Sequence, residues 1–242
     1  MMPGERLSIT RIEGRKCESR ESPALRLAEE PSWCSNLDLS LETRQRHDNL
    51  ERGMNRIFLL SPADCGGKRA SMILRSEAEF ELASRLRERE GVPIGELFSF
   101  LSGLYFRGKL AYSVAFSIPP TDVPGVLVIT PNKGMVPANY MVDHSTLQEF
   151  SASRIKISDD KYRGPLERDA LRISEQIGSQ SNVVLLGSLA TDKYLEVLKP
   201  IFGDRLKFPA EFVGRGDMSR GALLLKCVKE GRELSYIGVD AI

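Results

Sequence analysis

Apolar residues are dense along the chain from Met54 onward and sparse before it. Arg56–Ser61 is an almost unbroken apolar run that ends in Ser-Pro, and Val126–Thr130 and Asn182–Gly187 repeat the pattern. A run that is apolar on both faces is typical of a buried strand in a parallel or mixed sheet. A fourth, weaker run over Leu234–Val239 is expected to form a last strand.

Helical signals alternate with these runs. Ser76, with a glutamate three residues on, has the form of a capping box, and the helical spacing beyond it stops at Gly91. Pro165 is expected to open a helix, because proline is tolerated in the first turn, and Asp217 to cap one that Gly231 ends. Helices are therefore predicted over residues 76–90, 94–102, 105–117, 165–177, 190–199 and 218–230. Strands alternating with helices predict the α/β class, here a single compact domain with a mixed sheet flanked by helices.

Residues 1–53 differ from the rest of the chain. Their apolar positions repeat neither at 2 nor at 3.6 residues, and nine Lys and Arg against ten Asp and Glu give the segment a net charge of −1. The pattern predicts a disordered or weakly ordered N-terminal extension, followed by a folded domain over residues 54–242. Met54, directly before the first strand, is where a natural start is expected.

Composition narrows the class of protein. The chain has 242 residues, of which 41% are hydrophobic and 28% charged, which is ordinary for a globular protein. The net charge of +1 neither favours nor opposes a nucleic-acid partner, so any attraction for one must be local. The four cysteines, Cys17, Cys34, Cys65 and Cys227, have no metal-ligand spacing, and no secretory or membrane-spanning run is visible. A reduced cytoplasmic protein without membrane contact is expected.

Polar segments with glycine follow the predicted strands at residues 61–69, 130–137 and 187–191. In open α/β sheets ligands bind beyond the carboxyl ends of the strands, so these loops are expected to converge on one site. Gly66-Gly67-Lys68 either presents N–H groups and a cation to a phosphate or is a tight turn between strand and helix. Cys65 is either a nucleophile or, as we favour, a small buried side chain.

Three further segments bear on function. Tyr105 stands close to Arg107 and Lys109, a pattern suited to stacking on a base and holding phosphates, or else to core packing beside a solvated face. Gly214–Gly221 alternates glycine with charged residues ahead of a predicted helix, which favours an anion-binding loop. His144 is interpreted as part of a surface turn or helix cap.

Taken in order, these segments resemble the YaaA-like family, bacterial proteins associated with peroxide stress and DNA binding. The resemblance spans roughly residues 56–230. It is carried by Leu60–Ala63, Tyr105–Leu110, Val128–Pro137, Gly187–Tyr194 and Met218–Leu225. Asp64 stands where the family has a lysine, which reverses a charge in the expected site, with Lys68 as a conceivable substitute. Similar blocks occur in domains associated with nucleobase modification.

The resemblance implies a compact α/β fold with a positively charged cleft, DNA binding and protection under oxidative stress. Our leading hypothesis is a nucleic-acid-binding protein that also acts on a nucleobase or nucleotide. Phosphate binding is assigned to Lys68, Arg107, Lys109, Lys133, Arg215 and Arg220. Stacking or hydrogen bonding to a base is assigned to Tyr105, Tyr194 and Ser188, and acid–base chemistry to Ser61, Asp64 and Asp217.

Two alternatives remain open at this stage. The first is an enzyme acting on a free nucleotide or nucleoside without duplex contact, which needs a closed pocket. The second is a non-enzymatic interaction protein whose partner binds residues 1–53. The sequence names no cofactor, metal, reaction or oligomeric state.

Overall fold

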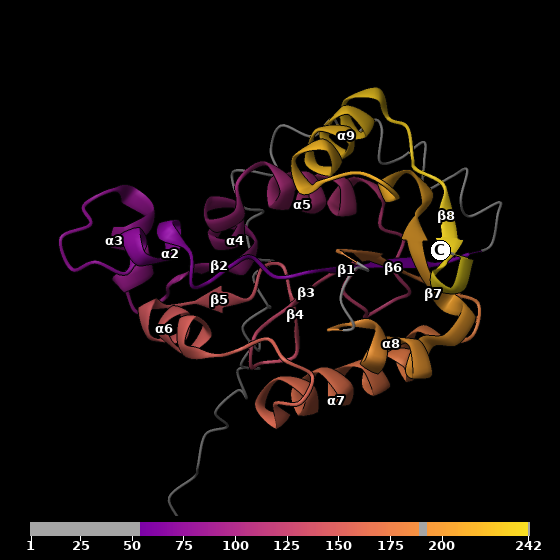
Figure 1. Ribbon diagram of the computed structural model, residues 1–242, viewed down its shortest axis with the longest axis horizontal. Helices are drawn as coiled ribbons and strands as arrows, with labels where there is room; N and C mark the ends of the chain where they lie inside the picture. Colours follow the sequence, from indigo (N-terminus) through magenta and orange to yellow (C-terminus); the bar gives the residue numbers. More distant parts are fainter. Residues whose placement is uncertain (1–53, 189–192, 242) are drawn as a thin grey trace, which may run out of the picture. The chain divides into compact units, whose positions relative to one another are not determined.

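A computed structural model describes residues 54–188 and 193–241, so the predicted extension over 1–53 lies outside the described residues. In this part of the chain the predicted α/β class is confirmed: a six-stranded mixed sheet is flanked by helices (Figure 1). The strands are β1 (Arg56–Leu60), β2 (Val92–Pro93), β3 (Val126–Ile129), β4 (Met135–Pro137), β5 (Met141–Val142), β6 (Asn182–Leu186), β7 (Leu206–Pro209) and β8 (Tyr236–Gly238). The helices are α2 (Lys68–Ile73), α3 (Glu81–Arg87), α4 (Ile94–Ser102), α5 (Leu104–Phe116), α6 (His144–Ala152), α7 (Asp160–Ile177), α8 (Leu195–Phe202) and α9 (Asp217–Glu230).

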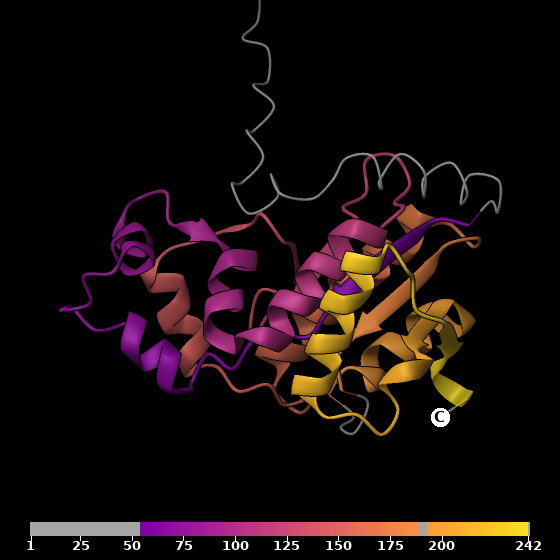
Figure 2. The ribbon, with the colours of Figure 1, turned by 90° about the horizontal axis from the view of Figure 1, so that it is seen from above.

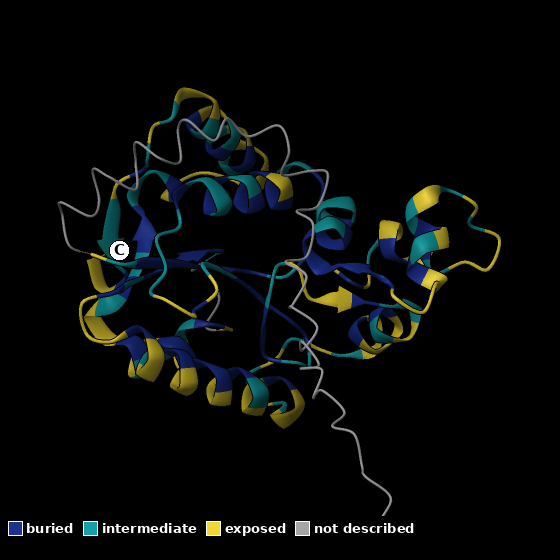
Figure 3. Ribbon diagram, turned by 180° about the vertical axis from the view of Figure 1, so that it is seen from behind, coloured by how far each residue is buried: buried dark blue, intermediate teal, exposed yellow. Residues whose placement is uncertain are grey.

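The main sheet has the strand order β4-β3-β1-β6-β7-β8. Strands β3, β1, β6 and β7 are parallel, whereas β4 and β8 pair antiparallel at the two edges. Strands β2 and β5 form a separate antiparallel pair. Helices α5 and α9 cover one face of the main sheet, and α7 and α8 cover the other (Figures 1 and 2). The central strands are therefore buried on both sides, as their continuous apolar sequence requires (Figure 3).

The order of the strands creates a topological switch point between β1 and β6. The chain leaves β1 through α5, on one face, to reach β3. It leaves β6 through α8, on the opposite face, to reach β7. The two connections diverge at the carboxyl ends of these neighbouring strands, which is where ligands bind in open α/β sheets.

The face formed by α5 and α9 depends on two glycines. A Cβ added to Gly108 would lie 2.7 Å from the carbonyl oxygen of Gly221, and one added to Gly221 would lie 2.8 Å from the Cα of Tyr105. The helices therefore touch backbone to backbone (Figure 2). This close packing brings the N-terminal turn of α9 against the N-terminal turn of α5.

Helix boundaries differ from several predictions. Ser76 caps nothing, because its hydroxyl donates to Glu77, and α3 begins only after Phe80, whose ring stacks on Phe100 at 5.4 Å. Helix α7 begins at Asp160, because the carboxylate of Asp159 accepts the N–H of Lys161. Pro165 therefore lies inside α7 and does not open it.

Three C-terminal predictions also need adjustment. Gly216, not Asp217, is the N-cap of α9, since Asp217 is already the first helical residue. Gly231 ends α9 as predicted, in the left-handed conformation that glycine adopts without strain. The helix predicted over 190–199 runs over Leu195–Phe202 in the described part of the chain, and the last strand is confined to Tyr236–Gly238.

Candidate functional site

Ser61 and Gly187 lie side by side directly after β1 and β6. The N–H of Ser61 donates to the carbonyl of Leu186 at 3.0 Å. A Cβ added to Gly187 would lie 3.0 Å from the Cβ of Ser61 and 3.3 Å from its Oγ. A side chain at Gly187 would therefore press against Ser61, so glycine allows these two segments to lie side by side at the switch point of the sheet.

Lys109 reaches this point from the buried face of α5. Its Nζ donates to the carbonyl oxygen of Ser61 at 2.6 Å and to the Oγ of Ser61 at 2.8 Å. It also lies 4.7 Å from the ring centre of Tyr105 and 4.8 Å from that of Phe106. Only 1% of Lys109 is exposed. Loss of water around the amine lowers the pKa of Lys109 to about 7, although the carboxylate of Asp217 acts in the opposite direction.

Arg220 joins the segments that follow β6 and β7. Its Nε and Nη2 donate to the carbonyl of Phe212 at 3.2 and 3.1 Å, and its Nη1 approaches the carbonyl of Gly187 at 3.5 Å. The guanidinium lies over the Phe212 ring and 3.9 Å from the carboxylate of Asp217. Within the described residues, these hydrogen bonds use three of its five N–H donors.

Two tyrosine hydroxyls complete the cluster. The hydroxyl of Tyr105 is buried and has no well-formed hydrogen bond with a described residue, although the guanidinium of Arg220 lies close enough to act on it as a hydrogen-bond donor. Burial raises the pKa of Tyr105 to about 12, while the nearby guanidinium of Arg220 acts in the opposite direction. Burial likewise raises the pKa of Tyr194 to about 12, with smaller contributions from Tyr105 and Asp217. Both phenols are therefore neutral donors at neutral pH.

We call Ser61, Tyr105, Lys109, Tyr194 and Arg220 the switch-point cluster. All five were assigned from sequence to roles that need contact with a ligand, and the fold brings them close together. Their parts differ from the assignment in two respects. Lys109 is buried behind Ser61, where it cannot hold a phosphate. The ring of Tyr105 is packed under Lys109 and beside Phe212, so its hydroxyl and not its face is offered to a ligand.

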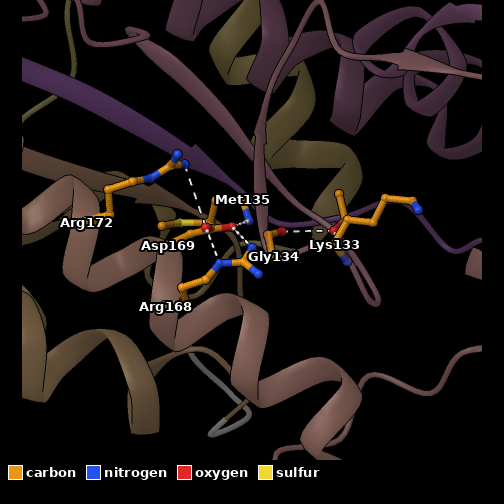
Figure 4. A network of polar contacts seen from close by, with 7 residues as sticks. Lys133, Gly134, Met135, Arg168, Asp169 and Arg172 are labelled. Atoms are coloured by element: carbon orange, nitrogen blue, oxygen red, sulfur yellow. Dashed lines mark hydrogen bonds and ion pairs between the residues drawn. The ribbon is translucent and has the colours of Figure 1, made fainter.

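Lys133 does not join this cluster. Its ammonium pairs with Glu149 at 3.2 Å. Its loop is fixed to α7, because the Asp169 carboxylate accepts the N–H of Met135 at 3.0 Å and a Cβ on Gly134 would collide with it (Figure 4). Arg168 and Arg172 neutralise the Asp169 carboxylate (Figure 4). The loop over residues 130–137 is therefore held in place by α7 and has a structural role.

The remaining assigned residues lie outside the cluster or on its border. The Asp64 carboxylate accepts the N–H of Gly66, which makes residues 61–69 a tight turn. Lys68 and Arg107 are exposed. Arg215 is also exposed and donates to Glu211 and Ser219 of its own segment.

Ser188 and Asp217 border the cluster. Ser188, directly after Gly187, is half-buried. Asp217 is exposed at the start of α9, and its charge acts on Tyr105, Lys109 and Tyr194. It is therefore close enough to affect the protonation of the cluster, although it is not buried within it.

Cys65 is a buried side chain and His144 lies at the start of a helix, which are the interpretations that the sequence analysis favoured. Cys65 is buried, and desolvation raises the pKa of its thiol to about 12, which excludes an activated nucleophile at neutral pH. His144 is the first residue of α6, whose N-cap is Asp143. Its Nε2 lies 3.3 Å from the carbonyl of Leu74.

A cavity of about 320 Å³ adjoins the turn after β1. The segment Ala63–Gly66 and Pro131 line it on the side of the sheet. Arg154, Lys156 and Lys193 supply positive charge at its wall. The sequence analysis missed these three cations. Arg154 and Lys156 follow α6, a short helix that it did not predict, and Lys193 lies between β6 and α8.

Within residues 54–188 and 193–241, no group of three or more His, Cys, Asp or Glu side chains is arranged to hold a metal ion. In the same residues, no helix combines the length and apolar character needed to span a membrane. No family model, no curated protein and no solved structure matches the chain.

Proposed function

We propose that the chain binds a nucleotide-like ligand at the carboxyl ends of β1 and β6 and acts on it as an enzyme. The observation that carries the proposal is the hydroxyl of Tyr105, which is buried beside the guanidinium of Arg220 at the start of α9 and has no well-formed hydrogen bond with a described residue. A buried polar group without a partner costs roughly 1–3 kcal/mol, which a ligand acceptor would recover. Arg220 and the N–H groups at the helix N-terminus favour an anion such as a phosphate.

The class of ligand rests on the sequence resemblance together with this placement. Blocks that resemble the YaaA-like family contribute Ser61, Tyr105, Tyr194 and Arg220, which come from four separate elements of the fold. A buried lysine with a lowered pKa, hydrogen-bonded to a serine, is the kind of perturbed group that clusters at catalytic sites. Together they support chemistry on the bound molecule.

Thermal unfolding of the full chain with mononucleotides and with inorganic phosphate tests the proposal. A ligand at 100 times its Kd stabilises the fold by about 2.7 kcal/mol, and a chain of this size gains roughly 2–4 °C per kcal/mol. Arg220→Gln should abolish the shift. Arg215→Gln should keep it, since Arg215 binds only its own segment. If neither phosphate nor any nucleotide raises the melting temperature, the proposal fails.

Nucleic acid is the second candidate, favoured by the cations Arg154, Lys156 and Lys193 around the cavity beside the site. Cations spaced along a surface can contact successive phosphates. Each contact with duplex DNA should then make the slope of log affinity against log salt concentration more negative by about 0.9. We would measure binding of labelled single-stranded and duplex DNA across a salt series. An affinity that does not change with salt would eliminate this candidate.

A further inference from the structure

The Ser61 hydroxyl and the Lys109 amine form a hydrogen-bonded pair at the switch point. Lys109 fits the observed geometry both as a neutral amine and as an ammonium ion. As an ammonium, Nζ donates to the carbonyl and the Oγ of Ser61 and directs its third proton toward the rings of Tyr105 and Phe106. As an amine, it keeps the carbonyl and ring contacts and turns its lone pair to Oγ, which then donates.

We propose that Ser61 is a nucleophile and Lys109 its base, in the transfer of an acyl group from an activated ester or amide. This inference rests on the proposed function, since the nucleotide-like part of the substrate is the anion held by Arg220. Gly187 lies beside Ser61 without a side chain, and a Cβ there would already lie 3.3 Å from Oγ. The hydroxyl of Tyr105, beside the guanidinium of Arg220, donates to the oxyanion.

The reaction proceeds in two steps. Oγ of Ser61 bonds to the carbonyl carbon of the substrate while its proton passes to Nζ of Lys109. The bond from that carbon to the leaving oxygen or nitrogen then breaks, and the leaving group takes the proton from Lys109. Water attacks the resulting acyl-serine, again giving a proton to Lys109. Cleavage of the bond between Oγ and carbon returns that proton to Ser61 and releases a carboxylic acid.

The environment allows Lys109 to act as a base near neutral pH. Among the described residues, the titratable and charged groups around the pair are Tyr105 on the same helix, Asp217 and Arg220 on α9, and Tyr194 before α8. Both phenols remain neutral, so in this part of the chain Asp217 and Arg220 carry the charges that act on the pair. With a pKa of about 7, roughly nine-tenths of Lys109 is unprotonated at pH 8.

The test uses p-nitrophenyl acetate on the full chain, with p-nitrophenol release and intact mass as readouts. We expect one acetyl group per chain, located on Ser61 by peptide mapping, with a rate that rises through an inflection near pH 7. Ser61→Ala should abolish the adduct. Lys109→Met should slow its formation by about 100- to 10,000-fold and remove the inflection. Ser71→Ala, at an exposed serine whose hydroxyl bonds the carbonyl of Gly67, should react like the wild type.

Three results would overturn the inference. The first is an adduct on another residue, and the second is an unchanged acylation rate in Lys109→Met. The third is a wild-type acylation rate that stays flat from pH 6 to pH 9 after subtraction of the Ser61→Ala rate. The wild-type pH profile decides the matter alone if Lys109→Met does not fold. Gly187→Ala is a second variant, which should slow acylation because its methyl group would lie 3.0 Å from the Cβ of Ser61 and displace Oγ from Lys109. Acylation needs no nucleotide, so nucleotide binding without acylation would refute this inference and leave the binding proposal intact. Acylation without nucleotide binding would support this inference and refute the binding proposal.

Discussion

The backbone contact between α5 and α9 makes Gly221→Ala the sharpest test of how the site is assembled. A methyl group at Gly221 would lie 2.8 Å from the Cα of Tyr105 and 2.9 Å from the carbonyl oxygen of Leu104. Both are backbone atoms, so no side-chain rotation can relieve the collision, and the helices must separate. Overpacking of this kind costs about 1–3 kcal/mol. Replacing a helical glycine returns about 1 kcal/mol, which leaves a net loss of at most about 2 kcal/mol.

Gly164→Ala is the matched control, because Gly164 is also helical but an added Cβ meets no atom within 4 Å. The free energy of unfolding in urea should rise by up to about 1 kcal/mol for Gly164→Ala and fall for Gly221→Ala. Separation of the helices also moves Arg220 away from Tyr105, so Gly221→Ala should lose the stabilisation by phosphate or nucleotide that Gly164→Ala keeps. If Gly221→Ala proves as stable as Gly164→Ala, the helices do not touch as described.

Three further outcomes are expected. Asp169→Ala should lower the free energy of unfolding by about 1–3 kcal/mol, because the N–H of Met135 loses its buried acceptor, while Asp169→Asn should lose less in the same urea titration. The N–H of Thr146 donates to the Asp143 carboxylate and holds the pKa of Asp143 below its usual value. The charged Asp143 therefore stabilises the fold fully at pH values above its unfolded pKa of about 3.9. This stabilisation is lost as the pH falls through the lower pKa of the folded state. The stability difference between the wild type and Asp143→Asn should therefore narrow between pH 6 and pH 3; an unchanged difference would contradict the cap. Cys65 should resist iodoacetamide at pH 7.5 in the native chain and react after unfolding, as peptide mapping would show.

The central strands could be predicted from sequence because their signal is local. Apolar side chains on both faces of β1, β3 and β6 are shielded from water when each segment is a parallel strand with helices on both sides of the sheet. Strand β7 was missed, because its four residues include a lysine and a proline and give no such run. Its burial comes from pairing with β6 and β8, which is a property of the assembled sheet.

The site was only partly predictable for a related reason. Topology places the loops after parallel strands at one edge of the sheet, and Ser61 and Gly187 lie together at that edge. Which cation reaches that edge depends on helix rotation and packing. Lys109 and Arg107 are two residues apart on α5, yet one is buried against Ser61 and the other is exposed. Lys133 follows a strand of the same sheet, but Asp169 on α7 holds its loop elsewhere.

The cost of burying Lys109 is the strongest argument that the pair with Ser61 is functional. A lysine at this depth loses its water and gains only two hydrogen bonds, both to one residue. An apolar side chain of similar length would fill the same space between α5 and β1 without that cost. A lysine that only braced the end of β1 could do so through the carbonyl of Ser61 alone, whereas Lys109 also contacts the hydroxyl. Burial of an amine and its contact with a serine hydroxyl are each unremarkable alone, but acid–base chemistry at Ser61 requires both together.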